Sequence, residues 1–342
     1  MHTETPPSAH FEDVIARSDV IFTIGVAGDS GSGKSTFSGA IREMFAPNLV
    51  STITLDDYHR LDRSARRAAG ITPLAPEANN IPLLEDHLGC IKRGETFIKP
   101  VYDHTSGTFG RPVPFPPTKI VILEGLHTLF TPALRGNLDF TLFVDPEETV
   151  KREWKIRRDV EGRGYSRMNV LREIEERKQD YDRYIAPQRA FADSVVRISP
   201  SKYNEGNPAG PLYRVTLLQK RPERTIHNVT LSIDLLDILS LSERSFYLEF
   251  SPRGLDGMKG GVLTVDGELH ADVIRQLERH VERETGIRAI PSISGKDYIT
   301  AVDMVRLILA WRIINTRIFY GDGDGRRTNA SDSRKTGKEI ID

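Results

Sequence analysis

A glycine-rich motif near the start of the chain constrains the fold more than any other feature. The segment from Gly28 to Ser35 reads Gly-Asp-Ser-Gly-Ser-Gly-Lys-Ser and fits the pattern G-x-x-x-x-G-K-[ST]. An apolar run from Val20 to Val26 precedes it, and a segment that can be helical follows it. This order of strand, loop and helix predicts a loop whose backbone N–H groups, together with the helix N-terminus, surround a phosphate.

Each residue type in the motif has a predicted task. Lys34 reaches the outer phosphates of a nucleoside triphosphate, and Ser35 holds Mg²⁺. An accidental Gly/Ser-rich turn is the alternative, but the flanking strand and helix favour binding of a nucleoside triphosphate. The residues expected to contact ATP are Gly28, Asp29, Ser30, Gly31, Ser32, Gly33, Lys34, Ser35 and Thr36.

Composition limits the remaining function classes. The 342 residues carry a formal net charge of -1, which argues against a general nucleic-acid or membrane-surface binder. The single Cys90 excludes an intrachain disulfide and a multi-cysteine metal site. No apolar run approaches the roughly 18 residues that span a bilayer. We therefore expect a cytoplasmic protein without nucleic-acid or membrane partners.

The first 200 residues alternate apolar runs with helical patterns, which predicts an α/β fold with a mostly parallel sheet and helices on both faces. Strands are expected at 20–26, 50–55, 119–123, 139–144 and 194–198, and helices at 34–46, 83–92, 147–160 and 167–185. After Pro200, strand-like segments at 213–218, 228–235, 246–250 and 262–265 are followed by helical patterns at 268–284 and 298–319. Short turns between these strands predict antiparallel pairing.

Four segments follow from this pattern. We expect a tail over 1–18, a P-loop domain over 19–200, a smaller C-terminal α+β region over 201–320 and a disordered tail over 321–342. The C-terminal region extends the sheet or forms the interface of a homo-oligomer, with a dimer expected. An effector site there is the less favoured alternative.

Asp56 follows the second predicted strand, where ligands of parallel sheets bind. A hydroxyl that attacks a phosphoryl group must lose its proton, and a carboxylate at this place is a candidate general base. A helix cap or Asx-turn is the alternative. His59 and Arg63 follow at offsets that turn them toward an anionic acceptor, although each alone is typical of a solvated surface.

Two further segments carry candidate site residues. Glu124 ends an apolar strand, where a P-loop protein places a second acid that binds Mg²⁺. Lys155, Arg158 and Asp159 form one patch on a predicted helix, and Arg163 lies between two glycines in a segment that can close as a lid. A buried strand end and a solvated basic face are the respective alternatives.

The turn-rich stretch from Lys99 to Gly107 contains Tyr102 and His104. Loops of this kind often carry binding residues, so both side chains are candidates for contact with an acceptor. A hairpin held by local hydrogen bonds is an equally plausible interpretation.

Taken together, these motifs resemble the phosphoribulokinases, within the group that includes uridine and pantothenate kinases. The most specific part is Trp-Lys-Ile-Arg-Arg-Asp at 154–159 followed by Arg163, which is similar to the pattern W-K-I-x-R-D-x-x-x-R. Asp-Asp-Tyr-His at 56–59, Tyr102-x-His104, Tyr-Ile-Ala-Pro-Gln at 184–188 and Phe-Ala-Asp at 191–193 also match. The resemblance spans about 21–200 and is closest to the bacterial or archaeal type.

The resemblance implies a P-loop kinase-type fold and ATP- and Mg²⁺-dependent phosphorylation of the C1 hydroxyl of ribulose 5-phosphate. The product, ribulose 1,5-bisphosphate, is the substrate of RuBisCO in carbon fixation. It implies Asp56 as base, Glu124 as the metal-directed acid, Lys155 as a cation for the transition state and Asp159 as a second acidic participant. The residues implied to hold the sugar phosphate are His59, Arg63, His104, Arg158 and Arg163.

The chain also departs from part of this group. Plant-type members carry a P-loop cysteine that forms a regulatory disulfide, whereas this chain has Ser32 there. Two other functions compete with the implied one. A uridine kinase-like nucleoside kinase has no use for an arginine cluster, because its acceptor lacks a phosphate. A nucleotide-gated switch or scaffold has no use for Asp56.

Overall fold

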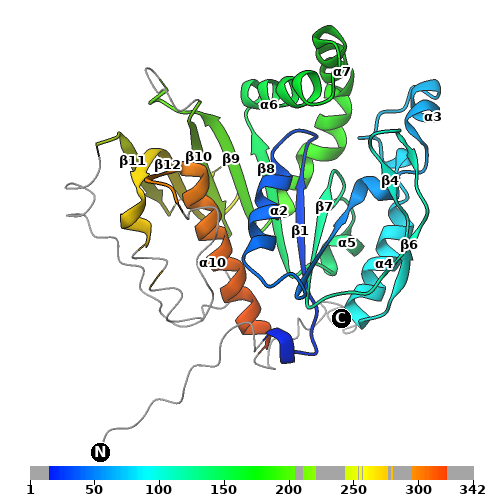
Figure 1. Cartoon of the computed structure of the whole chain (residues 1–342), viewed down its shortest axis with the longest axis horizontal. Coiled ribbons are helices and arrows are strands. Elements are labelled where there is room, and N and C mark those ends of the chain that lie inside the picture. Colours follow the sequence, from blue (N-terminus) through cyan, green and yellow to red (C-terminus); the bar gives the residue numbers. More distant parts are fainter. Residues whose placement is uncertain are drawn as a thin grey trace, which may run out of the picture.

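The computed structural model describes residues 15–204, 211–220, 243–275 except 253 and 256, 279, and 295–321, with side chains up to residue 314. Within these residues the main sheet has nine strands, in the order β11-β12-β10-β9-β8-β1-β7-β2, with β13 paired to β12 (Figure 1). The parallel strands are β1 (Phe22–Gly28), β2 (Val50–Thr54), β7 (Ile120–Gly125), β8 (Phe140–Pro146) and β9 (Ser194–Pro200). The antiparallel strands are β10 (Tyr213–Gln219), β11 (Phe246–Ser251), β12 (Gly261–His270) and β13 (Tyr298–Thr300).

The parallel half of the sheet is buried on both faces. Every residue of β1 is buried, and β1 pairs in parallel with β7 on one side and β8 on the other. A strand covered on both faces reads as a continuous apolar run, which is the pattern seen at 20–26. The predicted α/β class, with additional antiparallel strands, is confirmed.

Helices cover both faces of the sheet (Figure 1). On one face, α2 (Lys34–Glu43) and α10 (Ala301–Gly321) contribute Phe37, Ile41 and Ile313 to the first core cluster. On the other face, α4 (Ile81–Arg93) and α5 (Pro132–Gly136) contribute Leu88 and Leu134 to a second cluster. Because alternate strand residues point to opposite faces, the sheet divides the apolar side chains between the two clusters.

Two helical segments lie above the carboxyl ends of the parallel strands (Figure 1). The segment expected to be a helix over 147–160 is α6 (Glu148–Ile156), which continues into a π-helical turn, η3 (Arg157–Glu161). The segment expected over 167–185 is α7 (Arg167–Asp180), followed by a second π-helical turn, η4 (Tyr181–Ile185). Both segments are therefore helical as predicted, with a widened turn at the end of each.

Smaller elements surround the end of β2. They are η1 (Leu55–Tyr58), α3 (Arg63–Ala68), η2 (Pro76–Ala78), the pair β3 (Phe97–Lys99) and β6 (Val113–Phe115), and the pair β4 (Tyr102–Asp103) and β5 (Thr108–Phe109). One further turn of 3-10 helix, η5 (Ala186–Phe191), precedes β9. The turn-rich stretch that holds Tyr102 is thus a small antiparallel hairpin.

The antiparallel strands continue the same sheet. β10 pairs with β9 along its whole length, with Val215 opposite Ile198, and β12 and β11 follow. Two boundary predictions are wrong. Residues 298–300, expected to begin a helix, pair with β12 as β13, and β12 extends to His270, beyond the helix start expected at 268. The strand expected at 228–235 lies outside the described residues.

Within the part of the chain that the structure describes, no helix combines the length and the apolar character needed to cross a membrane.

Candidate active site

The phosphate-binding motif forms a tight loop between β1 and α2. Gly28 has a φ of 147°, and a Cβ there would lie 2.5 Å from the carbonyl oxygen of Val144 on the neighbouring strand. Gly33, with a φ of 87°, is the residue from which α2 begins. Neither position accepts a larger residue without strain, so the glycines are needed for the path of the backbone. The ammonium group of Lys34 folds back and donates to the carbonyl oxygen of Asp29 at 2.6 Å.

Oxygen ligands suited to Mg²⁺ lie at the end of β7, beside this loop. The Ser35 hydroxyl donates to Glu124 Oε1 at 2.7 Å, and the Ser38 hydroxyl donates to Oε2 at 2.5 Å. The described residues contain no group of three or more His, Cys, Asp or Glu side chains arranged to hold a metal. A site with one carboxylate and one hydroxyl suits Mg²⁺, which is usually held by few protein ligands together with substrate phosphates.

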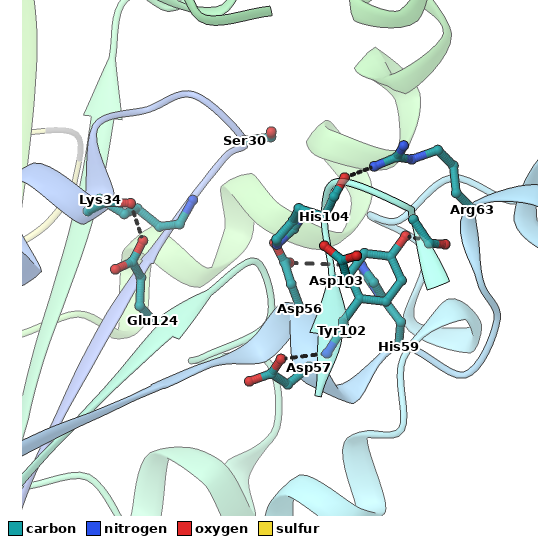
Figure 2. A network of polar contacts seen from close by, with 12 residues as sticks. Ser30, Lys34, Asp56, Asp57, His59, Arg63, Tyr102, Asp103, His104 and Glu124 are labelled. Carbon is teal, nitrogen blue, oxygen red and sulfur yellow. Dashed lines mark hydrogen bonds and ion pairs between the residues drawn. The ribbon is translucent and has the colours of Figure 1, made fainter. Parts of the chain in front are cut away.

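The Asp56 carboxylate lies across from Lys34, in η1 directly after β2 (Figure 2). Its Oδ2 is 3.2 Å from His104 Nε2, and its Oδ1 is 3.9 Å from His59 Nε2. Burial alone would raise the pKa of Asp56, but the hydrogen bond from His104 and the electrostatic interactions with His59, His104 and Lys34 lower it to about 2. The side chain is therefore a carboxylate at neutral pH, which a proton acceptor must be.

The orientation of His59 follows from its second ring nitrogen. Asn79 donates its amide group to the carbonyl oxygens of Pro73 and Ala75, so its Oδ1 is the atom that faces His59 Nδ1 at 2.9 Å. Nδ1 must then carry the hydrogen. Burial lowers the pKa of His59 to about 4, so the ring is neutral at pH 7 and its Nε2 is an acceptor that faces Asp56. A hydroxyl group can donate its hydrogen to either of these two acceptors, one at a time.

Arg63 forms hydrogen bonds with the β4–β5 hairpin, which lies beside Asp56. The Arg63 guanidinium donates to the carbonyl oxygen of His104 at 2.5 Å, and its backbone N–H donates to Gly107 O at 2.9 Å. The Tyr102 hydroxyl accepts from Arg66 at 3.0 Å and donates to Gly107 O at 3.1 Å. The hydroxyl of Tyr102 is thus engaged inside the protein, whereas the imidazole of His104 contacts Asp56.

Asp57, next to Asp56 in sequence, has a structural task. Its buried carboxylate accepts from the backbone N–H of Tyr102 at 2.8 Å and forms an ion pair with Lys99. The two adjacent carboxylates therefore differ in environment: Asp57 holds the hairpin, and Asp56 faces the loop that carries Lys34.

Basic side chains from the segment after β8 contact one buried carboxylate. Asp159 is 2% exposed and is contacted by Lys155 at 3.2 Å, Arg158 at 2.9 Å and Arg163 at 3.2 Å. Burial would raise the pKa of Asp159, but Arg158 and Lys155 outweigh it and lower the pKa. Arg158 also donates to the Ser30 hydroxyl at 3.3 Å, which places its guanidinium against the phosphate-binding loop.

Strand order explains where these groups lie. β2, which leads to Asp56, and β8, which leads to α6, lie on opposite sides of the pair formed by β1 and β7. Arg63 consequently lies on the β2 side, while Arg158 and Arg163 lie on the β8 side. The two sides meet where the Thr72 hydroxyl donates to Asp180 at 2.5 Å. Arg63, Arg158 and Arg163, which we expected to form one cluster, thus come from both sides of the phosphate-binding loop.

Sequence analysis did not identify two residues that lie near the site. Ser38 shares Glu124 with Ser35, one helical turn away, a spacing that the sequence does show. His127, three residues after Glu124, is 2% exposed. It lines a small pocket together with Asp56 and Tyr58. The sequence feature that could have identified His127 is its position three residues after the strand that ends in Glu124.

The fold and the loop define a P-loop kinase-type α/β protein, and solved structures agree. The phosphoribulokinase from Rhodobacter spheroides aligns over 87% of this chain and 99% of its own, with a TM-score of 0.53 and 18% identity. At this identity the likeness concerns the fold alone.

Sequence comparison adds the family. A sequence model of the Phosphoribulokinase / Uridine kinase family matches residues 23–203, so the chain belongs to this family. The chain is 42% identical over 202 residues to the phosphoribulokinase of Synechocystis, an alignment that covers 59% of this chain and 60% of that protein. It is 32% identical over 284 residues to the chloroplastic phosphoribulokinase of Triticum aestivum, covering 75% of this chain and 70% of that protein. A uridine kinase from Ligilactobacillus salivarius is 33% identical over 51% of this chain and 83% of its own length.

Proposed function

We propose that the protein transfers the γ-phosphoryl group of ATP to the C1 hydroxyl of D-ribulose 5-phosphate, giving ribulose 1,5-bisphosphate and ADP. The observation that carries this proposal is the Asp56 carboxylate, held by His104 at 3.2 Å and facing the loop that contains Lys34. A P-loop beside a fixed carboxylate suits phosphorylation of a hydroxyl. The relatives named phosphoribulokinase support the choice of acceptor.

In the proposed reaction the C1 hydroxyl lies between Asp56 and His59. Asp56 accepts its proton as the oxygen attacks the γ-phosphorus, and the bond to the ADP oxygen breaks. Before transfer, His59 Nε2, an acceptor in the neutral ring, is the alternative partner for the same hydroxyl hydrogen. His104 keeps Asp56 in place and lowers its pKa, so the side chain is ionised and can accept the proton.

The nucleotide side of the site uses the P-loop and Glu124. The backbone from Gly28 to Thr36 would surround the phosphates, and Lys34 would leave Asp29 O for a phosphate oxygen. Ser35 and Glu124 would hold Mg²⁺, which neutralises phosphate charge when bound. Burial lowers the pKa of Lys34, and Glu124, Asp56 and Asp29 oppose that effect.

The cations of α6 and η3 suit the charge that develops during transfer. Arg158 lies against Ser30, and Lys155 lies behind Gly31, where a Cβ would be 3.3 Å from the Lys155 Cβ. Asp159 holds these cations together, so we propose it as an organising acid for Lys155, Arg158 and Arg163. Arg63 and His104 on the β2 side, with Arg158 and Arg163 opposite, would receive the sugar phosphate. A homodimer remains our prediction for the assembly.

A nucleoside kinase is the second candidate, because the uridine kinase relative aligns over most of its own length. Its acceptor has no phosphate and would leave the arginines on both sides without a ligand. A coupled assay of ADP formation with ribulose 5-phosphate, uridine, pantothenate and ribose 5-phosphate separates the candidates. Turnover with ribulose 5-phosphate at a kcat/KM far above the others is expected, and preference for uridine would overturn the proposal.

A further inference from the structure

Trp154 packs directly on the phosphate-binding loop. A Cβ built on Gly33 would lie 3.0 Å from Trp154 Cζ3 and 3.7 Å from two further atoms of the six-membered ring. Gly33 is the left-handed residue from which α2 begins. The indole therefore occupies the space beside the backbone that turns from the loop into the helix, and its position limits where that backbone can lie.

A tyrosine outside the P-loop domain holds this indole. Trp154 Nε1 donates to the Tyr213 hydroxyl at 2.6 Å, a short distance for an N–H···O bond. The two rings meet edge to face, with centroids 5.1 Å apart and an interplanar angle of 82°. Tyr213 is the first residue of β10 and pairs with Pro200 of β9, so the extended sheet fixes its backbone.

A second contact joins the same C-terminal region to the same loop. Arg306, on α10, donates to the carbonyl oxygen of Thr36 at 3.0 Å. Asp303, one turn earlier, lies 3.5 Å from the Arg306 guanidinium and orients it. The region after β9 therefore contacts the start of α2 from two of its own elements, β10 through Trp154 and α10 directly.

We propose that Tyr213 is a positioning residue for the nucleotide, which acts through Trp154 to keep the Gly33 backbone in its phosphate-binding conformation. Without the hydroxyl, the indole can rotate about its side-chain bonds, and the loop loses the surface against which it is held. This gives the C-terminal sheet extension a part in ATP binding. The proposal rests on the proposed role of the loop as the ATP site, and it does not depend on the identity of the acceptor.

Tyr213→Phe tests the proposal because it removes one oxygen and keeps the ring. One lost hydrogen bond corresponds to about a two- to tenfold rise in the KM for ATP. The KM for ribulose 5-phosphate should stay within twofold of the wild type, since Tyr213 lies far from Asp56 in the strand order. Tyr247→Phe is the matched control, because that hydroxyl donates to Glu249 of its own strand at 2.9 Å.

A mutant cycle shows whether the effect passes through the indole. Once Trp154→Phe has removed the donor, adding Tyr213→Phe should raise the KM for ATP no further. Additive effects of the two changes would overturn the proposal, as would an unchanged KM for ATP in Tyr213→Phe.

Fluorescence provides a readout that a loss of stability alone would not produce. The chain has two tryptophans, so Trp311→Phe leaves Trp154 as the only one. In that background we expect Mg²⁺-ATP to change the emission saturably, and Tyr213→Phe to shift the midpoint to higher ATP. An unshifted midpoint refutes the positioning role. If calorimetry finds no ATP binding to the wild type, the proposed function fails instead.

Discussion

Asp56→Asn is the most direct test of the chemistry. The substitution keeps the size of the side chain and an oxygen that can still accept from His104, which lies 3.2 Å away. It removes the negative charge of the group and with it the ability to accept a proton. The pKa of Asp56 is about 2, so the wild-type group is fully ionised at pH 7 and is a weak base in the ground state. It can accept the proton only as the attacking oxygen becomes acidic during bond formation.

The size of the effect follows from this role. General-base assistance is worth about 10²- to 10⁴-fold in rate. At about 1.4 kcal/mol for each factor of ten, this corresponds to roughly 3 to 5.5 kcal/mol in the activation barrier. We expect kcat to fall by that factor, with the KM for ATP changed little. The assay is steady-state ADP formation at saturating ribulose 5-phosphate, with folding checked by circular dichroism.

Asp103→Asn is the matched control for this experiment. Asp103 is in the same hairpin as His104, but its Oδ1 accepts from the backbone N–H of Thr105 at 2.8 Å, a bond that an amide oxygen retains. Only the longer contact of Oδ2 with the backbone N–H of Ser106, at 3.2 Å, is lost. This variant should retain kcat within a few-fold. A folded Asp56→Asn enzyme with kcat within a few-fold of the wild type would refute the assignment of Asp56 as base.

Three further tests address the loop, the metal and a buried histidine. Gly33→Ala should abolish ATP binding in a calorimetric titration. The left-handed backbone at this position costs an alanine roughly 1–2 kcal/mol, and the new Cβ would press on Trp154. Gly70 has a similar φ but open space around it, so the Gly70→Ala variant should bind ATP normally. Glu124→Gln should raise the Mg²⁺ concentration needed for half-maximal rate on the order of 10- to 100-fold, and an unchanged requirement at fixed ATP would count against its metal role. Burial lowers the pKa of His127 from 6.5 to about 4, so the unfolded chain binds the proton first and stability falls as the pH drops through this window. His127→Gln should flatten that dependence by about 1.4 kcal/mol per pH unit in urea unfolding, and an unaltered slope would contradict it.

The parts of the site that could be predicted from sequence are those determined locally. The glycines of the loop from Gly28 to Ser35 determine its backbone geometry locally, and the strand before it is mostly apolar because both of its faces are buried. Asp56 and Glu124 end neighbouring parallel strands, so the topology alone brings them to one edge of the sheet. These placements needed only the periodicity of the strands and the rule that ligands bind beyond their carboxyl ends.

Side-chain partners from distant segments could not be predicted. The Tyr102 hydroxyl, expected to face the acceptor, is engaged by Arg66, which nothing in the local pattern indicates. Helical spacing placed Asp159 in one patch with Lys155 and Arg158, but it did not indicate that the carboxylate is buried in a π-helical turn and also contacted by Arg163. Residues 298–300 continue smoothly into a helical pattern and pair with β12 only because that strand has a free edge there.

The same reasoning explains why the C-terminal region carried no functional signal in the sequence. Trp154 and Tyr213 are 59 residues apart, and each alone is typical of a partly buried aromatic residue. Their contact exists because β10 pairs antiparallel with β9 and so returns the chain to the end of the sheet above which α6 lies. A region in whose sequence we identify no catalytic constellation can therefore still affect ATP binding. If so, changes elsewhere in β10 that leave Tyr213 in place should alter stability without altering the KM for ATP.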